Sequence, residues 1–311
     1  MHDRTTWRIR HRLAAALLAL VCVLAACAGG ETADQADRTA VEPLTVSAIP
    51  DQDPQELQRL YEQVAQYLQQ RLGVPVEYVP VTDYNASVSL FRSGDLDLVW
   101  FGGLTGVQAR LQTPGAEVIA QRDIDAQFHS VFIANTSTGL EPVGDVRGLE
   151  VLEGRRFTFG SESSTSGRLM PQYFLDQAGV SQDDFAGVPG FSGSHDKTID
   201  LVESGSFEAG VLNEQVWEAR VEAGDIDERK VGVIFRTPEY HDYHWILGPA
   251  AAERYGGDFA ERVRDALLGL STDDEQQAAV LDLFGARKFI PAQASDYDQI
   301  EQVARELGLV R

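Results

Sequence analysis

Cysteine is almost missing from this sequence, which contains only Cys22 and Cys27 among its 311 residues. Cysteine-rich metal sites and networks of disulfide bonds are therefore excluded. The chain also lacks the G-x-x-x-x-G-K-[ST] loop of ATPases and the G-x-S-x-G turn of serine hydrolases. We expect neither of these catalytic sites and no bound cofactor.

Basic residues are scarce as well, with 26 Lys and Arg against 48 Asp and Glu. Removal of residues 1–26 would leave 22 basic and 47 acidic residues, a formal charge of about −25. Such a charge argues against nucleic acid as a partner. It does not exclude an anionic ligand, because distant surface charges are screened over about 8–10 Å and a buried site depends on the donors that line it.

Long hydrophobic runs are absent too, since the uncharged run from Leu13 to Ala26 is too short to span a bilayer. Four arginines precede this run, which is typical of a secretory signal. The run ends in Leu-Ala-Ala-Cys, the pattern by which a bacterial lipoprotein is cleaved before its cysteine and acylated on it. We therefore expect a signal peptide over residues 1–26, lipid on Cys27 and a flexible tether over 27–43, which would anchor the protein to the outer face of the bacterial cell membrane.

Strand-like and helix-like segments alternate along the remaining residues, which predicts an α/β fold with parallel sheets covered by helices on both faces. The length of about 270 residues exceeds what one hydrophobic core usually serves, so two lobes are expected. A second set of segments begins after the glycine-containing stretch 139–154. The expected strands are 44–49, 74–81, 96–101, 118–120 and 130–134, then 156–160, 188–191, 208–212 and 231–236; the main expected helices are 54–72, 83–92, 166–178, 196–203, 214–223, 253–270, 272–284 and 297–307.

The run Ser164-Thr165-Ser166-Gly167 stands between an expected strand and an expected helix. Amides at a helix start have no partner inside the helix, and the helix dipole is positive there, so this turn offers several N–H donors and three hydroxyls to an anion. Serine and threonine are also ordinary helix caps, so a purely structural function is the alternative.

Further candidate donors occur at other strand ends. Trp100, Phe101, Gly102 and Gly103 follow a buried strand at the edge where open α/β sheets bind ligands, and core aromatics before a plain turn are the alternative. Tyr84 opens another helix, as does His195, whose imidazole would donate to an oxyanion unless it is simply exposed to solvent.

The run from Tyr240 to Trp245 is dense in polar aromatic side chains, and Tyr243 is expected to help wall a ligand. His241, Asp242 and His244 fit no closed zinc pattern, so we expect no metal.

These motifs resemble those of a known family. The stretch from Ser164 to Pro171 resembles the S-T-S-G-x-L-x-P signature of the phosphate, phosphite and phosphonate binding proteins of ABC importers. Further segments are similar to the branch described as putative selenate-binding proteins: VTDYNASVSLF (81–91), LDLVWFGGLTGVQAR (96–110), FGSESSTSGRLMP (159–171), FSGSHDKTIDLVESG (191–205), AGVLNEQVW (209–217) and TPEYHDYHW (237–245).

The resemblance implies a type II periplasmic-binding-protein fold, a Venus flytrap whose two α/β lobes are joined by a hinge that the chain crosses twice, near Asn135 and Trp245. Lobe 1 would comprise 44–134 and 246–311, and lobe 2 would comprise 135–245. The implied ligand-binding residues are Tyr84, Trp100, Phe101, Gly102, Gly103, Ser164, Thr165, Ser166, His195, Asn213 and Tyr243.

The resemblance also implies a function without catalysis: a monomeric lipoprotein that captures a small tetrahedral oxyanion and delivers it to a permease and its ATPase. Phosphonate binders have D-P-N before S-T-S, whereas this chain has Ser161-Glu162-Ser163. The ligand therefore stays open between a selenate-like anion and phosphonate, phosphite or phosphate. Two alternatives remain: a secreted enzyme on the same fold that uses His195, and an anion sensor for a membrane receptor.

Overall fold

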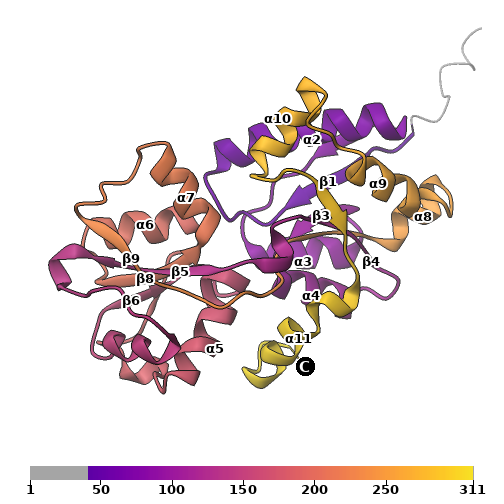
Figure 1. The fold of residues 1–311 in the computed structure, drawn as a ribbon. Coiled ribbons are helices and arrows are strands. Elements are labelled where there is room, and N and C mark those ends of the chain that lie inside the picture. Colours follow the sequence, from indigo (N-terminus) through magenta and orange to yellow (C-terminus); the bar gives the residue numbers. More distant parts are fainter. Residues whose placement is uncertain (1–40, 311) are drawn as a thin grey trace, which may run out of the picture. The chain divides into compact units, whose positions relative to one another are not determined.

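The computed structural model describes residues 41–310, and Figure 1 shows their helices packed on two separate sheets. The expected signal peptide, Cys27 and nearly all of the expected tether lie outside the described residues. Residues 43–311 form one compact unit. Within the described part of the chain, no helix is both long and apolar enough to cross a membrane.

The first sheet has six strands in the order β11-β4-β10-β3-β1-β2. Its strands are β1 (Leu44–Ala48), β2 (Val76–Tyr78), β3 (Leu98–Phe101), β4 (Glu117–Arg122), β10 (His244–Leu247) and β11 (Phe289–Pro291). In Figure 1 the helices on one face are α2 (Pro54–Leu72), α8 (Pro249–Tyr255), α9 (Phe259–Leu268) and α10 (Glu275–Leu283), and those on the other are α3 (Tyr84–Ser93), α4 (Gly103–Gln112) and α11 (Asp298–Glu306).

The second sheet has five strands in the order β7-β6-β8-β5-β9. Its strands are β5 (Ser130–Asn135), β6 (Phe157–Phe159), β7 (Gly190–Phe191), β8 (Ala209–Asn213) and β9 (Val231–Arg236). In Figure 1, α6 (His195–Glu203) and α7 (Glu214–Glu222) lie on one face and α5 (Met170–Gln177) on the other. Short 3₁₀ turns occur at Asp125–Gln127, Thr136–Thr138, Val146–Leu152, Gln182–Asp184 and Ala294–Tyr297.

The chain passes between the sheets in the segments 123–129 and 237–243. β5 pairs with β8 and β9, so it belongs to the second sheet, and the predicted lobe boundary near Asn135 is wrong by one strand. The second boundary also lies earlier than predicted, because His244 and Trp245 already pair with β3. Lobe 1 hereafter means 43–122 with 244–310, and lobe 2 means 130–236.

The expectation of parallel sheets is wrong for β5 and β10, the two strands that follow the segments between the lobes. β5 runs antiparallel to both of its neighbours, and β10 runs antiparallel to β3 and β4. β1, β2 and β3 are parallel, as are β6, β7 and β8. A strand that arrives from the other lobe enters without a crossover helix, so the rule that gives parallel neighbours does not apply to it.

Local sequence explains where the helices begin and end. The carboxylate of Asp53 accepts from the amides of Gln55 and Glu56, Pro54 occupies the first turn, and Gly73 ends α2 with a φ of 70°. The predicted helix 54–72 is therefore confirmed.

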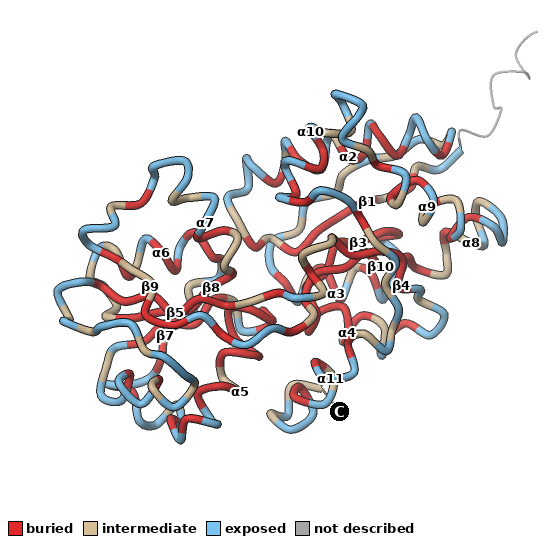
Figure 2. Tube along the Cα trace, in the orientation of Figure 1, coloured by how far each residue is buried: buried red, intermediate tan, exposed pale blue. Residues whose placement is uncertain are grey.

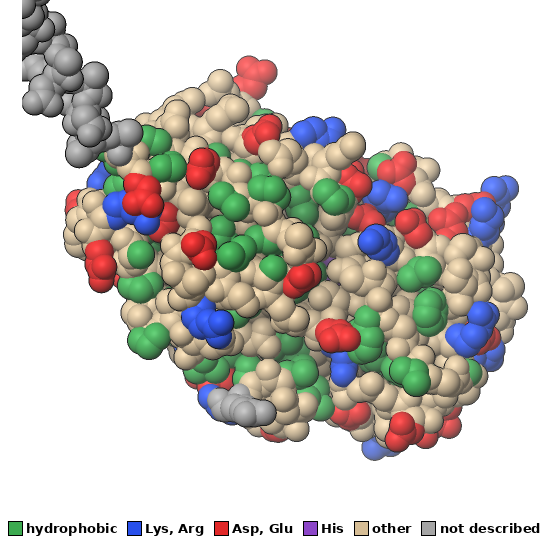
Figure 3. Space-filling view, turned by 180° about the vertical axis from the view of Figure 1, so that it is seen from behind, with side chains coloured by type: hydrophobic (Ala, Val, Ile, Leu, Met, Phe, Trp, Pro, Cys, Tyr) green, Lys and Arg blue, Asp and Glu red, His purple; other side chains and the backbone are tan. Residues whose placement is uncertain are grey.

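Burial follows the strands and the sheet-facing sides of the helices, as Figure 2 shows. Every residue of β3, β5, β8 and β10 is buried. On the face drawn in Figure 3, acidic and basic side chains are interspersed, so the negative charge is not gathered into one patch there.

Candidate functional site

The hydroxyl-rich turn after β6 leads into a short π-helix, η4 (Thr165–Leu169), which continues as α5. Ser164 caps it by accepting the Gly167 N–H at 2.9 Å. The N–H groups of Thr165 and Ser166 have no acceptor among residues 41–310, and the Arg168 N–H does not bond to the Ser164 carbonyl, which accepts from Leu169 instead. All three residues are buried. Buried amides are nearly always paired, so unpaired ones gathered at a helix start indicate an anion site.

Two buried hydroxyls lie beside these amides. Neither Tyr84 Oη nor Ser166 Oγ has a hydrogen-bond partner in the described residues, and the two side chains are 2 % and 1 % exposed. Tyr84 comes from lobe 1 and lies next to Ser164 of lobe 2, so donors from both lobes converge. Burial raises the pKa of Tyr84 well above its usual range, which keeps the phenol proton available.

His195, at the start of α6, is fully buried, so the alternative of a solvent-exposed histidine is wrong. Its Nδ1 accepts the Asn213 N–H at 3.3 Å, and burial lowers its pKa to about 3. The ring is therefore neutral with its proton on Nε2. Nε2 lies 3.4 Å from Tyr243 Oη, which is long for a hydrogen bond, so this N–H remains able to donate to an anion.

The glycine turn before α4 faces the same region, but its amides are already engaged. Gly103 N–H donates to Asp242 Oδ1 and Leu104 N–H donates to Thr165 Oγ1, both at 2.9 Å. A Cβ at Gly102 would lie 3.3 Å from each of these two oxygens, so a larger residue there would crowd both side chains. The amides at the start of α4 therefore bind Asp242 and Thr165. The sequence had instead predicted direct contact between the Gly102-Gly103 turn and an anion.

Asp242 is a residue that the sequence reasoning considered only as a metal ligand. Its side chain is 1 % exposed, and its Oδ2 lacks a hydrogen-bond partner in the part of the chain that is described. Burial raises the pKa of Asp242 to about 7, while the Gly103 N–H and the hydroxyls of Thr165 and Ser166 oppose the shift. Asp242 thus places one acceptor, partly protonated near neutral pH, among these donors.

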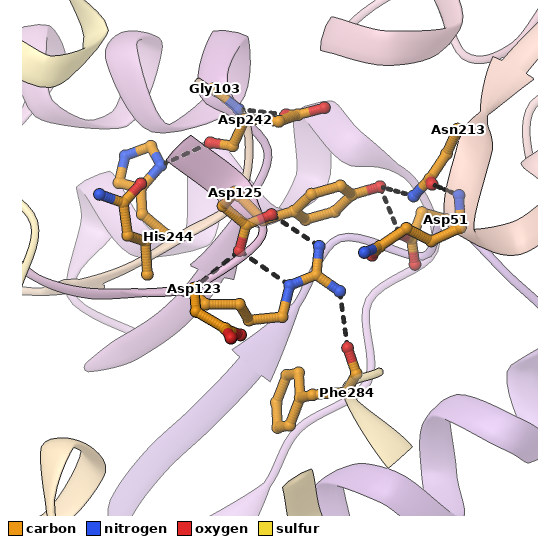
Figure 4. A network of polar contacts seen from close by, with 12 residues as sticks. Asp51, Gly103, Asp123, Asp125, Asn213, Asp242, His244 and Phe284 are labelled. Atoms are coloured by element: carbon orange, nitrogen blue, oxygen red, sulfur yellow. Dashed lines mark hydrogen bonds and ion pairs between the residues drawn. The ribbon is translucent and has the colours of Figure 1, made fainter. Parts of the chain in front are cut away.

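A second buried carboxylate, Asp51, holds the predicted residues Tyr243 and Asn213 (Figure 4). Tyr243 Oη donates to Asp51 Oδ2 at 2.7 Å and accepts from Asn213 Nδ2 at 3.1 Å. Asn213 Oδ1 accepts the first amides of α7. The polar atoms of Tyr243 and Asn213 therefore have protein partners, which gives these residues a supporting function.

Burial raises the pKa of Asp51 to about 6, against the lowering effect of the Tyr243 hydroxyl and of Arg122. The backbone carbonyl of Asp51 also accepts the backbone N–H of His195 at 2.9 Å. This bond ties lobe 1 to the start of α6. Asp51 comes three residues after the last residue of β1, a strand-end position of the kind that places residues in a cleft. That position was the available sequence signal, and the prediction missed it.

The predicted aromatics form the support of this network. The Trp100 ring stacks on Tyr243 at 5.7 Å, and the Arg122 guanidinium lies 5.4 Å from the Trp100 ring and 5.0 Å from the Tyr243 ring. Arg122 is fixed by Asp125 and by the Phe284 carbonyl. Phe101 packs edge-on against Phe91, so for Phe101 the alternative of a core aromatic is confirmed.

Two cavities border the site, and each is lined by both lobes. One of about 130 Å³ is lined by residues that include Asp51, Trp100, Asn213 and Tyr243. The other, of about 430 Å³, is lined by residues that include Pro50, Tyr84, Ser161 and Ser194. The cluster of unpaired donors therefore lies where the lobes meet, beside two hollows between them. Among residues 41–310, no group of three His, Cys, Asp or Glu side chains is arranged to hold a metal ion.

Residues 46–297 match the model of a family described as ABC transporter, phosphonate, periplasmic substrate-binding protein. The chain is 48 % identical over 269 residues to a probable ABC transporter phosphite binding protein, PhnD1, of Prochlorococcus marinus (strain MIT 9301), covering 86 % of this chain and 91 % of that relative. It is 24 % identical to the phosphate-import protein PhnD of Mycolicibacterium smegmatis, covering 97 % of each.

The structure also resembles that of PhnD1 from Prochlorococcus marinus solved in complex with methylphosphonate. The TM-score is 0.84 at 47 % identity, covering 86 % of this chain and 98 % of the other. This match confirms the predicted two-lobed periplasmic-binding-protein fold.

Proposed function

The chain belongs to the family of periplasmic substrate-binding proteins of phosphonate ABC transporters, and on this basis we propose that it captures a small phosphorus oxyanion that still carries a proton. Family membership makes it the extracytoplasmic binding component of an importer, with a permease and an ATPase as partners, rather than an enzyme. The choice of a protonated phosphorus oxyanion as the ligand goes beyond family membership and is supported by the geometry of the site.

The observation that carries this proposal is the buried carboxyl of Asp242, whose Oδ2 has no partner in hydrogen-bond geometry among the described residues and which lies close to the hydroxyls of Thr165 and Ser166. The N–H groups of Thr165 and Ser166, the hydroxyls of Tyr84 and Ser166 and the His195 Nε2–H all suit anionic oxygens. The ionised form of Asp242 can only accept hydrogen bonds, so it favours a ligand oxygen that carries a proton.

Protonation separates the ligand candidates that the sequence left open. The singly charged forms of phosphonate, phosphite and phosphate carry an O–H proton and are populated near neutral pH, whereas selenate and sulfate carry none. The Asp242 carboxylate would repel a fully deprotonated anion, which could bind only the protonated form of this group, whereas a protonated anion can donate to the carboxylate. The names of the relatives agree with this choice, because one is a phosphite binding protein and its solved structure contains methylphosphonate.

Capture would work by closure of the lobes. Tyr84 comes from lobe 1, the Thr165–Arg168 amides come from lobe 2, and Asp242 lies in the segment that passes between them. An anion that binds all of these groups favours the arrangement in which they are close together. The permease would then recognise the closed lobes.

The ligand class is tested by thermal denaturation of the full chain with phosphite, methylphosphonate, phosphate, sulfate and selenate at equal concentrations. At about 100 times its Kd, the true ligand stabilises the protein by about 2.7 kcal/mol, which raises Tm by roughly 5–10 °C for a domain of this size. We expect the largest shift with phosphite or methylphosphonate. A larger shift with selenate or sulfate would refute the proposed ligand class.

We also propose that lipid on Cys27 anchors the protein to the outer face of the membrane, because a cysteine follows the small residues that end the signal-like run. Cys27→Ser should release the protein from the membrane fraction of the cells that express it. The parent chain should remain in that fraction and incorporate labelled fatty acid. Equal membrane retention of both proteins would contradict the anchor.

A further inference from the structure

The anion-facing turn is a π-helix, and this geometry frees one more amide than an α-helix would. Leu169 N–H donates to Ser164 C=O and Met170 N–H donates to Thr165 C=O, each five residues back along the chain. In an α-helix the Ser164 carbonyl would instead accept the Arg168 N–H. The π-helix therefore leaves the Arg168 amide beside those of Thr165 and Ser166 at the start of the helix.

Pro171 supplies a chemical reason for this geometry. The Gly167 carbonyl would accept from residue 171 in an α-helix, but proline has no N–H to donate. Gly160, at the end of β6, takes that place and donates to Gly167 C=O at 2.8 Å. The strand end is thereby bonded directly to the first turn of the helix.

Two glycines make this contact sterically feasible. A Cβ on Gly160 would lie 3.1 Å from Gly167 Cα, and a Cβ on Gly167 would lie 3.1 Å from Gly160 Cα. Both distances are shorter than an ordinary carbon contact. Any larger residue at either position would push the strand and the turn apart.

The guanidinium of Arg168 does not supply the binding group. It lies over the rings of Phe159 and Phe191, at 4.6 and 5.5 Å, and the side chain is mostly buried there. What Arg168 presents at the helix start is its backbone N–H.

We propose that Pro171, together with the Gly160–Gly167 contact, is a positioning element that holds η4 in its π form and so presents the Arg168 amide to the bound oxyanion. This inference rests on the proposed anion-binding function. It assigns a physical reason to the spacing in which a glycine is followed four residues later by a proline.

The test is Pro171→Ala, which restores an N–H that competes with Gly160 for the Gly167 carbonyl. The turn then relaxes toward an α-helix, and Ser164 C=O takes the Arg168 N–H. We expect phosphite, the probe ligand, to bind roughly 10- to 100-fold more weakly by titration calorimetry, the range for one hydrogen bond to a charged group. The Tm without ligand should be unchanged or higher, because the variant gains a helical hydrogen bond. Pro249→Ala, the same change in the first turn of α8, is the matched control and should leave affinity unchanged.

A spectroscopic readout separates positioning from a general structural effect. With selective ¹⁵N-arginine labelling, the Arg168 amide of the parent protein should shift when phosphite is added and should exchange quickly with solvent when it is absent. In Pro171→Ala the same amide should be protected from exchange even without ligand. Equal phosphite affinity of the two proteins, or equal exchange of the Arg168 amide in both, would overturn the inference.

The readouts also distinguish this inference from the proposed function. If the parent protein binds none of the oxyanions, the proposed function fails. The exchange comparison then still decides whether Pro171 controls the Arg168 amide.

Discussion

At the scale of single residues, we predict that Asp242 determines which anion binds, because its carboxyl is an acceptor beside unpaired donors. Asp242→Asn keeps an oxygen for the Gly103 N–H but turns the second oxygen into an NH₂ donor. We expect phosphite affinity to fall about 10- to 100-fold, while binding of selenate or sulfate improves. Titration calorimetry over the anion panel measures both effects, with Asp123→Asn, a carboxylate paired with the exposed Arg287, as the control. An unchanged order of affinities would contradict this function of Asp242.

The raised pKa of Asp242 also makes a prediction about stability. Between the ordinary value of 3.8 and the folded value of about 7, the folded protein binds a proton that the unfolded chain has released. The contribution of this group to the free energy of unfolding is therefore complete below about pH 4 and is lost as the pH rises through 7. The loss amounts to roughly 4 kcal/mol for a shift of this size. Urea unfolding at pH 4.5, 6 and 7.5 should show a steeper fall for the parent protein than for Asp242→Asn, and parallel curves would contradict the shift.

The sequence singled out Tyr84, Ser166 and other candidate donors but neither of the two buried carboxylates, for a physical reason. Ser164 and its neighbours can be recognised from the local sequence alone, because hydroxyl side chains just before a helix are known to cap it or to bind anions. Asp51 and Asp242 are ordinary acidic residues in polar segments, and only tertiary packing removes them from water. Nothing within a few residues of either carboxylate encodes that burial.

At the scale of elements, we predict that the start of η4 binds the anion through its backbone N–H groups. Thr165→Pro removes one amide and the hydroxyl, yet proline is well tolerated in the first turn of a helix, so the fold should survive. We expect binding of phosphite to be abolished. Thr165→Val keeps the amide and removes only the oxygen that accepts the Leu104 N–H, so its loss should be smaller, about tenfold.

Glu275→Pro, at the first position of the exposed start of α10, is the matched control for the helix-start proline. Circular dichroism should show that all three variants are folded. Normal phosphite binding by Thr165→Pro would eliminate this helix start as the anion site.

The local sequence predicts the bounds of some helices and strands, but not the sheet to which every strand belongs. Helix α2 has a capping residue at each end, Asp53 and Gly73, so the sequence predicted both of its bounds to the residue. β5 was recognised as a strand but assigned to the wrong lobe, because its apolar side chains can pair in either sheet and the choice is made by β8 and β9, at least 70 residues further along the chain. The π form of η4 likewise depends on Gly160 lying close to it.

At the scale of the whole binding unit, residues 43–311, ligand affinity should depend on contacts that exist only when the lobes meet. Ser163 Oγ of lobe 2 donates to Asn85 Oδ1 of lobe 1 at 2.9 Å, and Asn85 contributes no group to the cluster of unpaired donors. Asn85→Ala removes this closed-state contact while leaving the anion site intact. One neutral hydrogen bond contributes about 0.5–1.5 kcal/mol, so every anion should bind about 2- to 10-fold more weakly, with the order of affinities unchanged.

This uniform loss distinguishes a closure contact from a ligand contact, since Asp242→Asn is expected to change the order. Small-angle scattering provides the second measurement, because Asn85→Ala should need a higher phosphite concentration to reach the same compact radius of gyration. Ser89→Ala, a change of an exposed side chain on α3 that lines neither cavity, should alter neither quantity. If Asn85→Ala weakened the binding of phosphite alone, Asn85 would be acting at the ligand, and the description of capture as closure around a shared anion would need a different contact.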